Sequence, residues 1–236
     1  MYSHYTLKSD IIKMLTILIT LGSTREYIDP VRFLSNASSG KMGKALTDEA
    51  LKQNCKVIAV KGPCNTEIKK NKNCKVIDVI SARDMLSAVK KNLKNADIFM
   101  GAAAVSDYRP ATISKNKIKK QDIENNETFS LQLVKNPDII KYVSEHKNKK
   151  QISIGFALET KNLLKYAETK LKEKDLDMIV ANKASAISSD KSQVVLIFKN
   201  GKRKTLKLSS KQKIAKEIIN ESIGIFKNNK TCQNGN

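Results

Sequence analysis

Aromatic residues are scarce in this sequence: it contains no tryptophan, and aromatic side chains make up 5% of its 236 residues. Proteins that bind single-stranded nucleic acids stack the bases on aromatic side chains, so this composition argues against such a platform. Histidine and cysteine are also rare, with two and four copies, and no two cysteines form a CxxC pair. We therefore expect neither a structural zinc site nor a disulfide framework, and the sequence does not indicate which residues would bind a metal.

Long apolar runs are missing too. The run Met14–Leu21 is shorter than the roughly 20 apolar residues that a membrane-spanning helix needs. It continues without a cleavage-site pattern, which argues against a signal peptide. We expect a cytoplasmic protein with no membrane partner, in which residues 1–12 form a short leader, 13–226 one domain and 227–236 a disordered tail.

Acidic residues are outnumbered: 44 lysines and arginines face 23 aspartates and glutamates, for a net charge of +21. The excess is mostly lysine spread along the chain, without an arginine-rich arm. Such a charge attracts nucleotides and other small polyanions, but it is also typical of a lysine-rich proteome with solvated helix faces. We expect no specific nucleic-acid partner. The alternative, a basic nucleic-acid-binding protein, predicts binding that weakens steeply with salt.

Strand and helix patterns alternate along the chain. The apolar, β-branched run 15–21 predicts a strand buried on both faces, as in parallel sheets. Further strands are predicted at 56–61, 75–80, 97–104, 152–157, 177–180, 193–198 and 204–208, and helices at 41–53, 82–94, 137–147, 160–174 and 211–226. This order predicts an α/β, Rossmann-like, doubly wound and mostly parallel sheet. Asn200-Gly201 predicts a hairpin between the last two strands.

Residues 108–134 interrupt the alternation, and they are rich in lysine, asparagine and glutamate. Long excursions of this kind are usually flaps or interface arms. Lys117 and Lys119 share one face if the segment is extended, which would suit polyphosphate. A solvated lysine run is the simpler interpretation in so basic a chain. Lys170 and Lys174, at i and i+4 on a predicted helix, allow the same two interpretations.

The turn Ser35–Gly43 opens the first predicted helix. Ser38, Ser39 and Gly40 would present hydroxyls and free N–H groups at the positive end of the helix dipole, which is an anion site. Ordinary helix capping by Ser38 or Ser39 explains the same residues about equally well. Asn36 is harder to assign to capping, because its amide can donate to an anionic oxygen without adding charge.

The run Gly101–Ala104 follows a predicted strand and carries only small side chains. A planar group could approach this backbone closely, or the small residues could serve tight strand–helix packing. Asp107 stands just beyond and could bind a ribose hydroxyl, a base amino group or a metal, or could cap a loop.

Five stretches, taken in order, resemble the phosphopantothenate–cysteine ligase family, also called phosphopantothenoylcysteine synthetase. They are TREYIDPVRFLSNASSGKMG, AAAVSDYRPATISKNKIKKQ, LVKNPDII, IGFALET and LDMIVAN, and the resemblance runs from Leu15 to Phe226. The KIKKQ form is similar to the bacterial, CTP-using type. The chain resembles a stand-alone synthetase without the decarboxylase domain, and a separate decarboxylase is implied to act next.

The resemblance implies a two-step ligation. The carboxylate of 4′-phosphopantothenate reacts with CTP to give an acyl-cytidylate and pyrophosphate, and the amine of cysteine then displaces CMP. Mg²⁺ is implied with CTP, and family members are homodimers with active sites near the subunit interface. Such chemistry depends on orientation and charge stabilisation, and it needs no nucleophilic side chain.

The resemblance also implies roles for single residues. Asn36 matches an asparagine that contacts the acyl-cytidylate, Arg32 an arginine tied to the second half-reaction, and Lys117 the lysine of a flap. The nucleotide-binding positions implied are Gly101, Ala102, Ala103, Asp107, Lys117, Pro137, Asp138, Ile139, Ile140, Phe156, Lys170 and Lys174. Ser38, Ser39 and Gly40 become the expected floor for a substrate phosphate.

Two positions depart from the family pattern: Ser23 stands where a glycine is usual, and Tyr27 where a proline is usual. Ser23 could impede a glycine-only backbone conformation in the first loop. A Rossmann-type reductase is the alternative enzyme, but no GxGxxG fingerprint with a ribose-binding acid is present.

Overall fold

The computed structural model describes residues 14–119, 128–159, 161–183 and 191–231. The leader expected at 1–12, part of the excursion and the last five residues of the expected tail lie outside this part of the chain. Among the described residues, no helix has the length and apolar character to cross a membrane.

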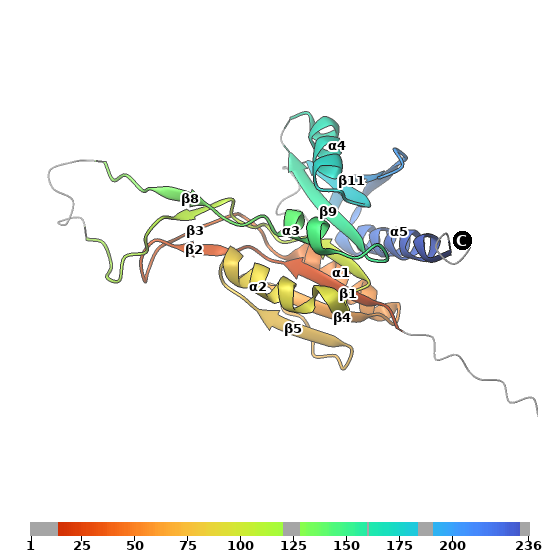
Figure 1. The fold of residues 1–236 in the computed structure, drawn as a ribbon, viewed down its shortest axis with the longest axis horizontal. Helices are drawn as coiled ribbons and strands as arrows, with labels where there is room; N and C mark the ends of the chain where they lie inside the picture. The colour runs from red at the N-terminus through yellow and green to blue at the C-terminus, as the bar shows by residue number, and fades with distance from the viewer. Residues whose placement is uncertain (1–13, 120–127, 160, 184–190, 232–236) are drawn as a thin grey trace, which may run out of the picture.

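One large sheet organises the molecule (Figure 1). Its strands are β1 (Thr16–Leu21), β4 (Lys56–Lys61), β5 (Cys74–Asp78), β6 (Ile98–Gly101), β9 (Ile152–Glu159), β10 (Met178–Lys183), β11 (Lys191–Phe198) and β12 (Arg203–Ser210). They lie in the order β12-β11-β10-β9-β6-β1-β4-β5. The six strands from β5 to β10 are parallel, and β11 and β12 add the predicted hairpin. The parallel part has the Rossmann strand order, so the predicted fold class is confirmed.

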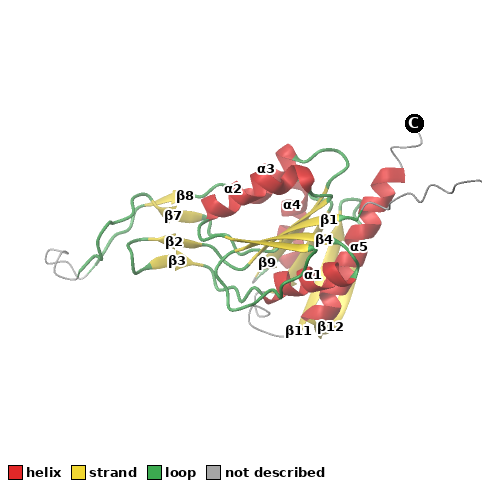
Figure 2. Ribbon diagram, turned by 90° about the horizontal axis from the view of Figure 1, so that it is seen from below, coloured by secondary structure: helices red, strands yellow, loops and turns green. Residues whose placement is uncertain are grey.

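Helices cover both faces of this sheet. They are α1 (Lys41–Lys52), α2 (Ala82–Asn92), α3 (Ile139–His146), α4 (Leu163–Glu173) and α5 (Lys211–Thr231), with a short 3₁₀ helix, η1, at Leu93–Asn95. Figure 2 shows α2 and α3 on one side of the strands and α1 and α5 on the other. Alternate residues of β1 point to opposite faces: Ile17 and Ile19 pack in the core under α1 and α5, and Leu18 in the core under α2 and α3.

Two small antiparallel sheets project from one end of the large sheet (Figures 1 and 2). One pairs β2 (Arg25–Tyr27) with β3 (Phe33–Ser35), and the other pairs β7 (Tyr108–Pro110) with β8 (Leu133–Lys135). None of these four strands was predicted, because three residues are too few to show an alternating pattern. The second sheet forms the base of the predicted 108–134 excursion.

Several helix ends differ from the predictions. α1 is preceded by Gly40 with a φ of 73°, and neither Ser38 nor Ser39 is its N-cap. α3 begins at Ile139 rather than at Pro137, because the side chain of Asp138 caps it by accepting the N–H of Lys141 at 2.9 Å. The predicted tail boundary at 227 is also wrong, since α5 continues to Thr231.

Ser23 fits its loop without the strain expected from a missing glycine. The residue with a left-handed backbone is its neighbour Gly22, with a φ of 79°, and Ser23 is absent from the residues with positive φ. The hydroxyl of Ser23 is largely buried and donates to the carbonyl of Pro63 at 3.1 Å. The serine therefore adds a hydrogen bond to this turn.

Candidate active site

A cavity of about 910 Å³ lies at the carboxyl ends of β1, β6, β9 and β10. This is the edge where open parallel sheets bind their ligands, at the point where the strand order reverses between β1 and β6. Most of the predicted site residues line it: Asn36, Ser38, Ser39, Gly40, Gly101, Ala102, Ala103, Asp107, Pro137, Asp138, Ile139, Ile140, Phe156 and Lys170. Five segments that are far apart in the sequence therefore meet here.

The amino-terminal end of α1 forms one wall of the cavity. Gly40 precedes it with a left-handed backbone, and a Cβ there would lie 2.7 Å from both Cys64 Sγ and Thr66 Oγ1. Only glycine fits on both counts. The hydroxyls of Ser38 and Ser39 accept backbone N–H groups at the long distances of 3.4 and 3.5 Å. They are therefore weakly engaged, and the wall offers hydroxyls and the positive end of the helix dipole to an anion.

Asn36 joins this wall to the opposite one. Its Nδ2 donates to the carbonyl oxygen of Val105 at 3.0 Å, and the asparagine itself is exposed. The bond connects residues 69 positions apart. The turn before α1 and the loop after β6 thus form one continuous surface.

The loop after β6 supports both interpretations of its small residues. A Cβ on Gly101 would come within 3.3 Å of Ile140 and Phe99, so close packing accounts for this glycine. Ala102 and Ala103 are partly exposed and line the cavity, which leaves their backbone open to a ligand. Asp107 is exposed at the same wall.

The lysines predicted on α4 are held in place by oxygen atoms. Lys170 Nζ donates to the carbonyl of Phe156 at 2.9 Å, and Lys174 Nζ pairs with Asp138 Oδ2 at 2.7 Å. Lys174 does not line the cavity; it acts on Asp138, which does. Burial opposes ionisation of Asp138, but the N–H of Lys141 and the Lys174 ammonium outweigh it and lower the pKa of the carboxyl.

The cavity also contains polar residues that the sequence analysis missed. Asn136, Asn182, Ser106 and Lys211 line it. Within the described residues, Asn182 Oδ1 and Ser106 Oγ are buried without a hydrogen-bond partner. Asn182 follows an apolar strand pattern, so a polar residue at a strand end was the signal that could have identified it.

Arg32 and Lys117 lie outside this cavity. The Arg32 guanidinium binds the buried carboxylate of Asp29 and the carbonyl of Ile118. Hydrogen bonds from the Arg32 side chain and from the N–H groups of Val31, Arg32 and Ile118 hold the pKa of Asp29 far below its usual range. Lys117 itself is exposed. The roles implied for Arg32 and Lys117 stay predictions.

Comparison with known proteins identifies the family. The family model described as "DNA/pantothenate metabolism flavoprotein C-terminal domain" matches residues 12–225. The chain belongs to this family. The family relationship predicted from the five stretches is thereby confirmed.

Relatives of this C-terminal domain family extend over nearly the whole chain. The coenzyme A biosynthesis bifunctional protein CoaBC of Haemophilus influenzae is 42% identical over 212 residues, which is 89% of this chain and 51% of that protein. The chain therefore spans about half the length of the curated relatives that it matches. The solved C-terminal domain of a CoaBC protein has a TM-score of 0.73 at 39% identity and covers 88% of this chain and 93% of its own.

A more distant solved structure shows the same fold. A Cab2 mutant, solved as a complex with phosphopantothenate-cysteine, has a TM-score of 0.77 at 19% identity and covers 93% of this chain and 89% of its own. At that identity the likeness supports the fold alone.

No cluster of three or more histidine, cysteine, aspartate or glutamate side chains that could hold a metal occurs among the described residues. Magnesium in nucleotide sites is usually held by the phosphates and one or two carboxylates. The exposed carboxylate of Asp107 at the cavity fits that pattern. A metal that arrives with a nucleotide is thus compatible with this family member, whereas a cage built only by its described side chains is not.

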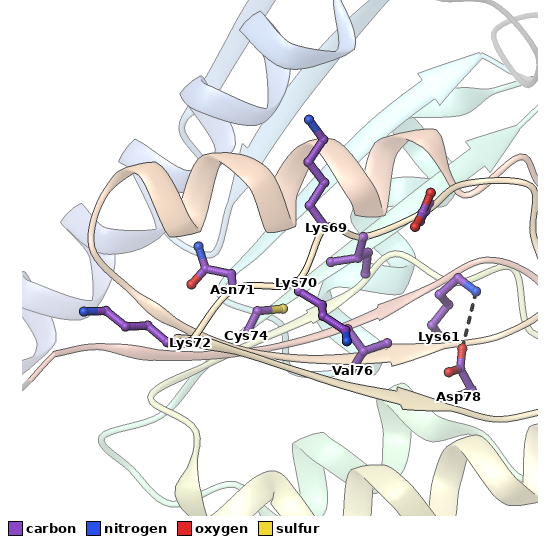
Figure 3. Close-up of a pocket in the computed structure, with 10 residues that line it drawn as sticks. Lys61, Lys69, Lys70, Asn71, Lys72, Cys74, Val76 and Asp78 are labelled. Carbon is purple, nitrogen blue, oxygen red and sulfur yellow. Dashed lines mark hydrogen bonds and ion pairs between the residues drawn. The ribbon is translucent and has the colours of Figure 1, made fainter.

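A second hollow, of about 650 Å³, lies beside β5 (Figure 3). Lys61, Lys69, Lys70 and Lys72 line it, and Lys61 pairs with Asp78 at 3.3 Å. Figure 3 shows Lys69 and Lys72 pointing in different directions, so the charges do not converge on one point. None of the predicted site residues lies here.

Proposed function

We propose that this chain joins 4′-phosphopantothenate to L-cysteine with CTP, through a phosphopantothenoyl-cytidylate, as a phosphopantothenate–cysteine ligase. The products are 4′-phosphopantothenoylcysteine, CMP and pyrophosphate. Membership of the family and CoaBC relatives named for coenzyme A biosynthesis support the proposal. The observation that carries it is the cavity at the strand ends. There the amino terminus of α1, preceded by Gly40, lies with Asn36 and a wall of small residues.

The chemistry needs a charge-stabilising site. A carboxylate oxygen of phosphopantothenate attacks the α-phosphorus of CTP, and pyrophosphate leaves. The amine of cysteine then attacks the acyl carbon, loses a proton to solvent, and CMP leaves with the bridging oxygen. Both steps are accelerated by holding the reacting groups together and by placing donors where negative charge develops. The exposed amide of Asn36 and the N–H groups at α1 are such donors.

The two ends of the cavity suit the two substrates. The turn of Ser38, Ser39 and Gly40 would receive the phosphate of phosphopantothenate or of its cytidylate. Nucleotide contacts would come from the cavity residues of the loop after β6, of the loop before α3 and of β9. Lys170, held by the Phe156 carbonyl, adds a cation to that side. Asn182 Oδ1 is an acceptor that a ligand N–H would satisfy.

Mg²⁺ belongs to the proposal as a companion of CTP. When bound, it would neutralise charge on the phosphates. Asp107 is the residue of this chain that we assign to it, because its carboxylate is exposed at the cavity.

A homodimer would complete the site. Large apolar side chains are exposed on the two small sheets and on the turn between β2 and β3, including Val31 at 57%, Phe33 at 39%, Tyr108 at 49% and Leu133 at 45%. Clustered exposed apolar groups mark association surfaces. A second copy docked on these sheets could bring its Arg32 and Lys117 toward the cavity, which neither residue lines in its own chain. We place the reaction in the cytoplasm, with a decarboxylation of the product as the next step.

The test is a discontinuous assay with the purified chain. Phosphopantothenate, cysteine and Mg²⁺ are incubated with CTP or with ATP, and the products are identified by mass spectrometry. We expect phosphopantothenoylcysteine and CMP with CTP, and far less product with ATP. Absence of ligated product with every nucleotide would overturn the proposal. The alternative reductase is disfavoured because β1 leads into β2 and β3 rather than directly into a phosphate-binding helix.

A further inference from the structure

The carboxylate of Asp29 lies in the turn between β2 and β3, and its side chain is fully buried. Its Oδ1 accepts the N–H groups of Val31 and Arg32, each at 2.8 Å. Its Oδ2 accepts Arg32 Nε at 2.9 Å, Arg32 Nη2 at 2.5 Å and the N–H of Ile118 at 3.2 Å. One carboxylate thus connects the turn to a residue 89 positions away.

The segment 114–118 is anchored to this turn by more than one contact. Arg32 Nη2 also donates to the carbonyl of Ile118 at 2.6 Å, so both backbone groups of Ile118 are held. The N–H of Ser114 donates to the carbonyl of Ile28 at 2.9 Å. Lys117 lies between these two anchored residues.

Apolar packing does not fix this segment. Residues 115–117 are exposed, Ile113 is 63% exposed, and Ile118 is only partly buried. The polar contacts with Asp29 and Arg32 are therefore what determines the path of the backbone beside Lys117. A buried ion pair is weak evidence for stability, because its desolvation cost offsets its attraction, but it can fix geometry.

The two carboxylate oxygens of Asp29 make different contacts, and these contacts indicate two roles. Its Oδ1 closes the turn between β2 and β3, as aspartates commonly do. Turn formation requires only that oxygen. Its Oδ2 serves Arg32 and Ile118, and these contacts would be superfluous if Asp29 only shaped the turn.

We infer that Asp29 is a positioning residue for Lys117: through its Oδ2 and through Arg32, it fixes the backbone of 114–118 and so sets where the lysine can place its charge. The inference rests on the proposed function and on the role that the family resemblance implies for Lys117, in forming the acyl-cytidylate. Arg32 then helps to hold the backbone of 114–118 for the first half-reaction, in addition to the role that the resemblance implies for it in the second half-reaction.

The test uses Asp29→Asn in the full chain. An asparagine keeps one oxygen for the turn but replaces Oδ2 by an NH₂ group that cannot accept from Arg32 or Ile118. We expect formation of the acyl-cytidylate from phosphopantothenate, CTP and Mg²⁺ without cysteine, measured in a single turnover, to slow by about 10- to 100-fold, the cost of a misplaced catalytic group. CTP affinity should change little.

A double-mutant cycle with Lys117→Ala makes the result specific. Because Asp29 acts through Lys117, the double variant should be no slower than Lys117→Ala alone. Multiplicative effects of the two substitutions would overturn the inference. Arg32→Lys, which keeps the charge but loses the forked contact with Asp29 and Ile118, serves as the second variant if Asp29→Asn does not fold.

Hydrogen–deuterium exchange supplies a readout without catalysis. In Asp29→Asn, peptides that cover 114–118 should exchange faster than in the wild type, while peptides from α1 and α5 should not change. Unchanged exchange in 114–118 would overturn the inference. If the wild type forms no acyl-cytidylate at all, the proposed function fails, and exchange still reports separately whether Asp29 anchors the segment.

Discussion

Asn36 Nδ2 and the carbonyl oxygen of Val105 lie 3.0 Å apart and form a hydrogen bond across the cavity. This bond ties the turn before α1 to the loop after β6, so it links the cavity wall at the α1 terminus to the wall of small residues. An amide at this point can leave Val105 and donate to a ligand oxygen without changing the charge of the site.

Asn36→Asp should abolish most of the activity. The carboxylate cannot donate to Val105 or to a ligand, and it places negative charge beside an anionic intermediate. Loss of one such donor typically lowers the rate by about 100- to 1,000-fold. Acyl-cytidylate formed without cysteine, quantified by mass spectrometry after acid quench, measures the effect.

Asn95→Asp is the matched control for the added charge, because Asn95 is exposed and does not line the cavity. It should behave as wild type. Equal activity of Asn36→Asp and Asn95→Asp would show that the Asn36 amide has no part in the reaction.

Gly40→Ala should weaken both stability and phosphopantothenate binding. The alanine would have to adopt a left-handed backbone conformation, and its Cβ would lie 2.7 Å from Cys64 Sγ and Thr66 Oγ1. Gly201→Ala is the control, since Gly201 also has a positive φ of 83° but nothing lies within 4 Å of its Cβ position. We expect Gly201→Ala to cost about 1–2 kcal/mol in free energy of unfolding, and Gly40→Ala to cost more.

Urea denaturation and isothermal titration with phosphopantothenate check this pair. Gly201→Ala should keep its affinity for the ligand, while Gly40→Ala should lose it. Similar ligand affinities in the two variants would contradict an anion site at the α1 terminus.

Lys174→Gln should change how the free energy of unfolding depends on pH. In the wild type the lowered pKa of Asp138 contributes stability that is present above the ordinary aspartate pKa of about 3.9 and is lost as pH falls through the lowered value. Removing the Lys174 ammonium raises the pKa of Asp138 toward its ordinary range, so the variant should be less stable at neutral pH. The difference from wild type should shrink as the pH falls below 4.

Urea denaturation between about pH 2.5 and pH 7 measures that difference, with Lys172→Gln as the control on an exposed position of the same helix. If the free energies of unfolding of Lys174→Gln and wild type differ by the same amount down to pH 2.5, the Lys174–Asp138 pair is not the cause of the difference.

Val31→Asp combined with Leu133→Asp should dissociate the proposed dimer. Both side chains are exposed, Val31 in the turn between β2 and β3 and Leu133 on β8, and a buried unpaired carboxylate in an interface is costly. Leu208→Asp is the control, because Leu208 is 66% exposed on β12 of the large sheet. Sedimentation velocity should show monomers only for the double variant, and activity should fall with dissociation. A wild type that sediments as a monomer would remove the basis of the dimer.

The cavity could be predicted from the sequence because parallel strands place their carboxyl ends on one edge. Gly101 and Phe156 lie on predicted strands that end at this edge, and Asn36 lies in the turn before the predicted first helix, which returns to the same edge. The short strands β2, β3, β7 and β8 could not be predicted, since three residues carry no periodicity.

Contacts between residues far apart in the sequence could not be predicted either. The lack of space for a Cβ at Gly40 is due to Cys64 and Thr66, which follow β4 in the sequence. The bond from Ile118 to Asp29 spans 89 positions, and no spacing rule relates such residues. Sequence resemblance suggested the importance of Arg32 and Lys117, but only the structure shows that Asp29 binds both Arg32 and Ile118, the residue after Lys117.

An isotope experiment tests the central claim most directly. Phosphopantothenate labelled with ¹⁸O in its carboxylate is incubated with the wild-type chain, CTP, Mg²⁺ and cysteine, and CMP is analysed by mass spectrometry. The proposed acyl-cytidylate predicts that one ¹⁸O atom appears in the phosphate of CMP, because the bridging oxygen leaves with it. Product formation with ¹⁸O in inorganic phosphate instead, or CMP free of label, would contradict the proposed reaction.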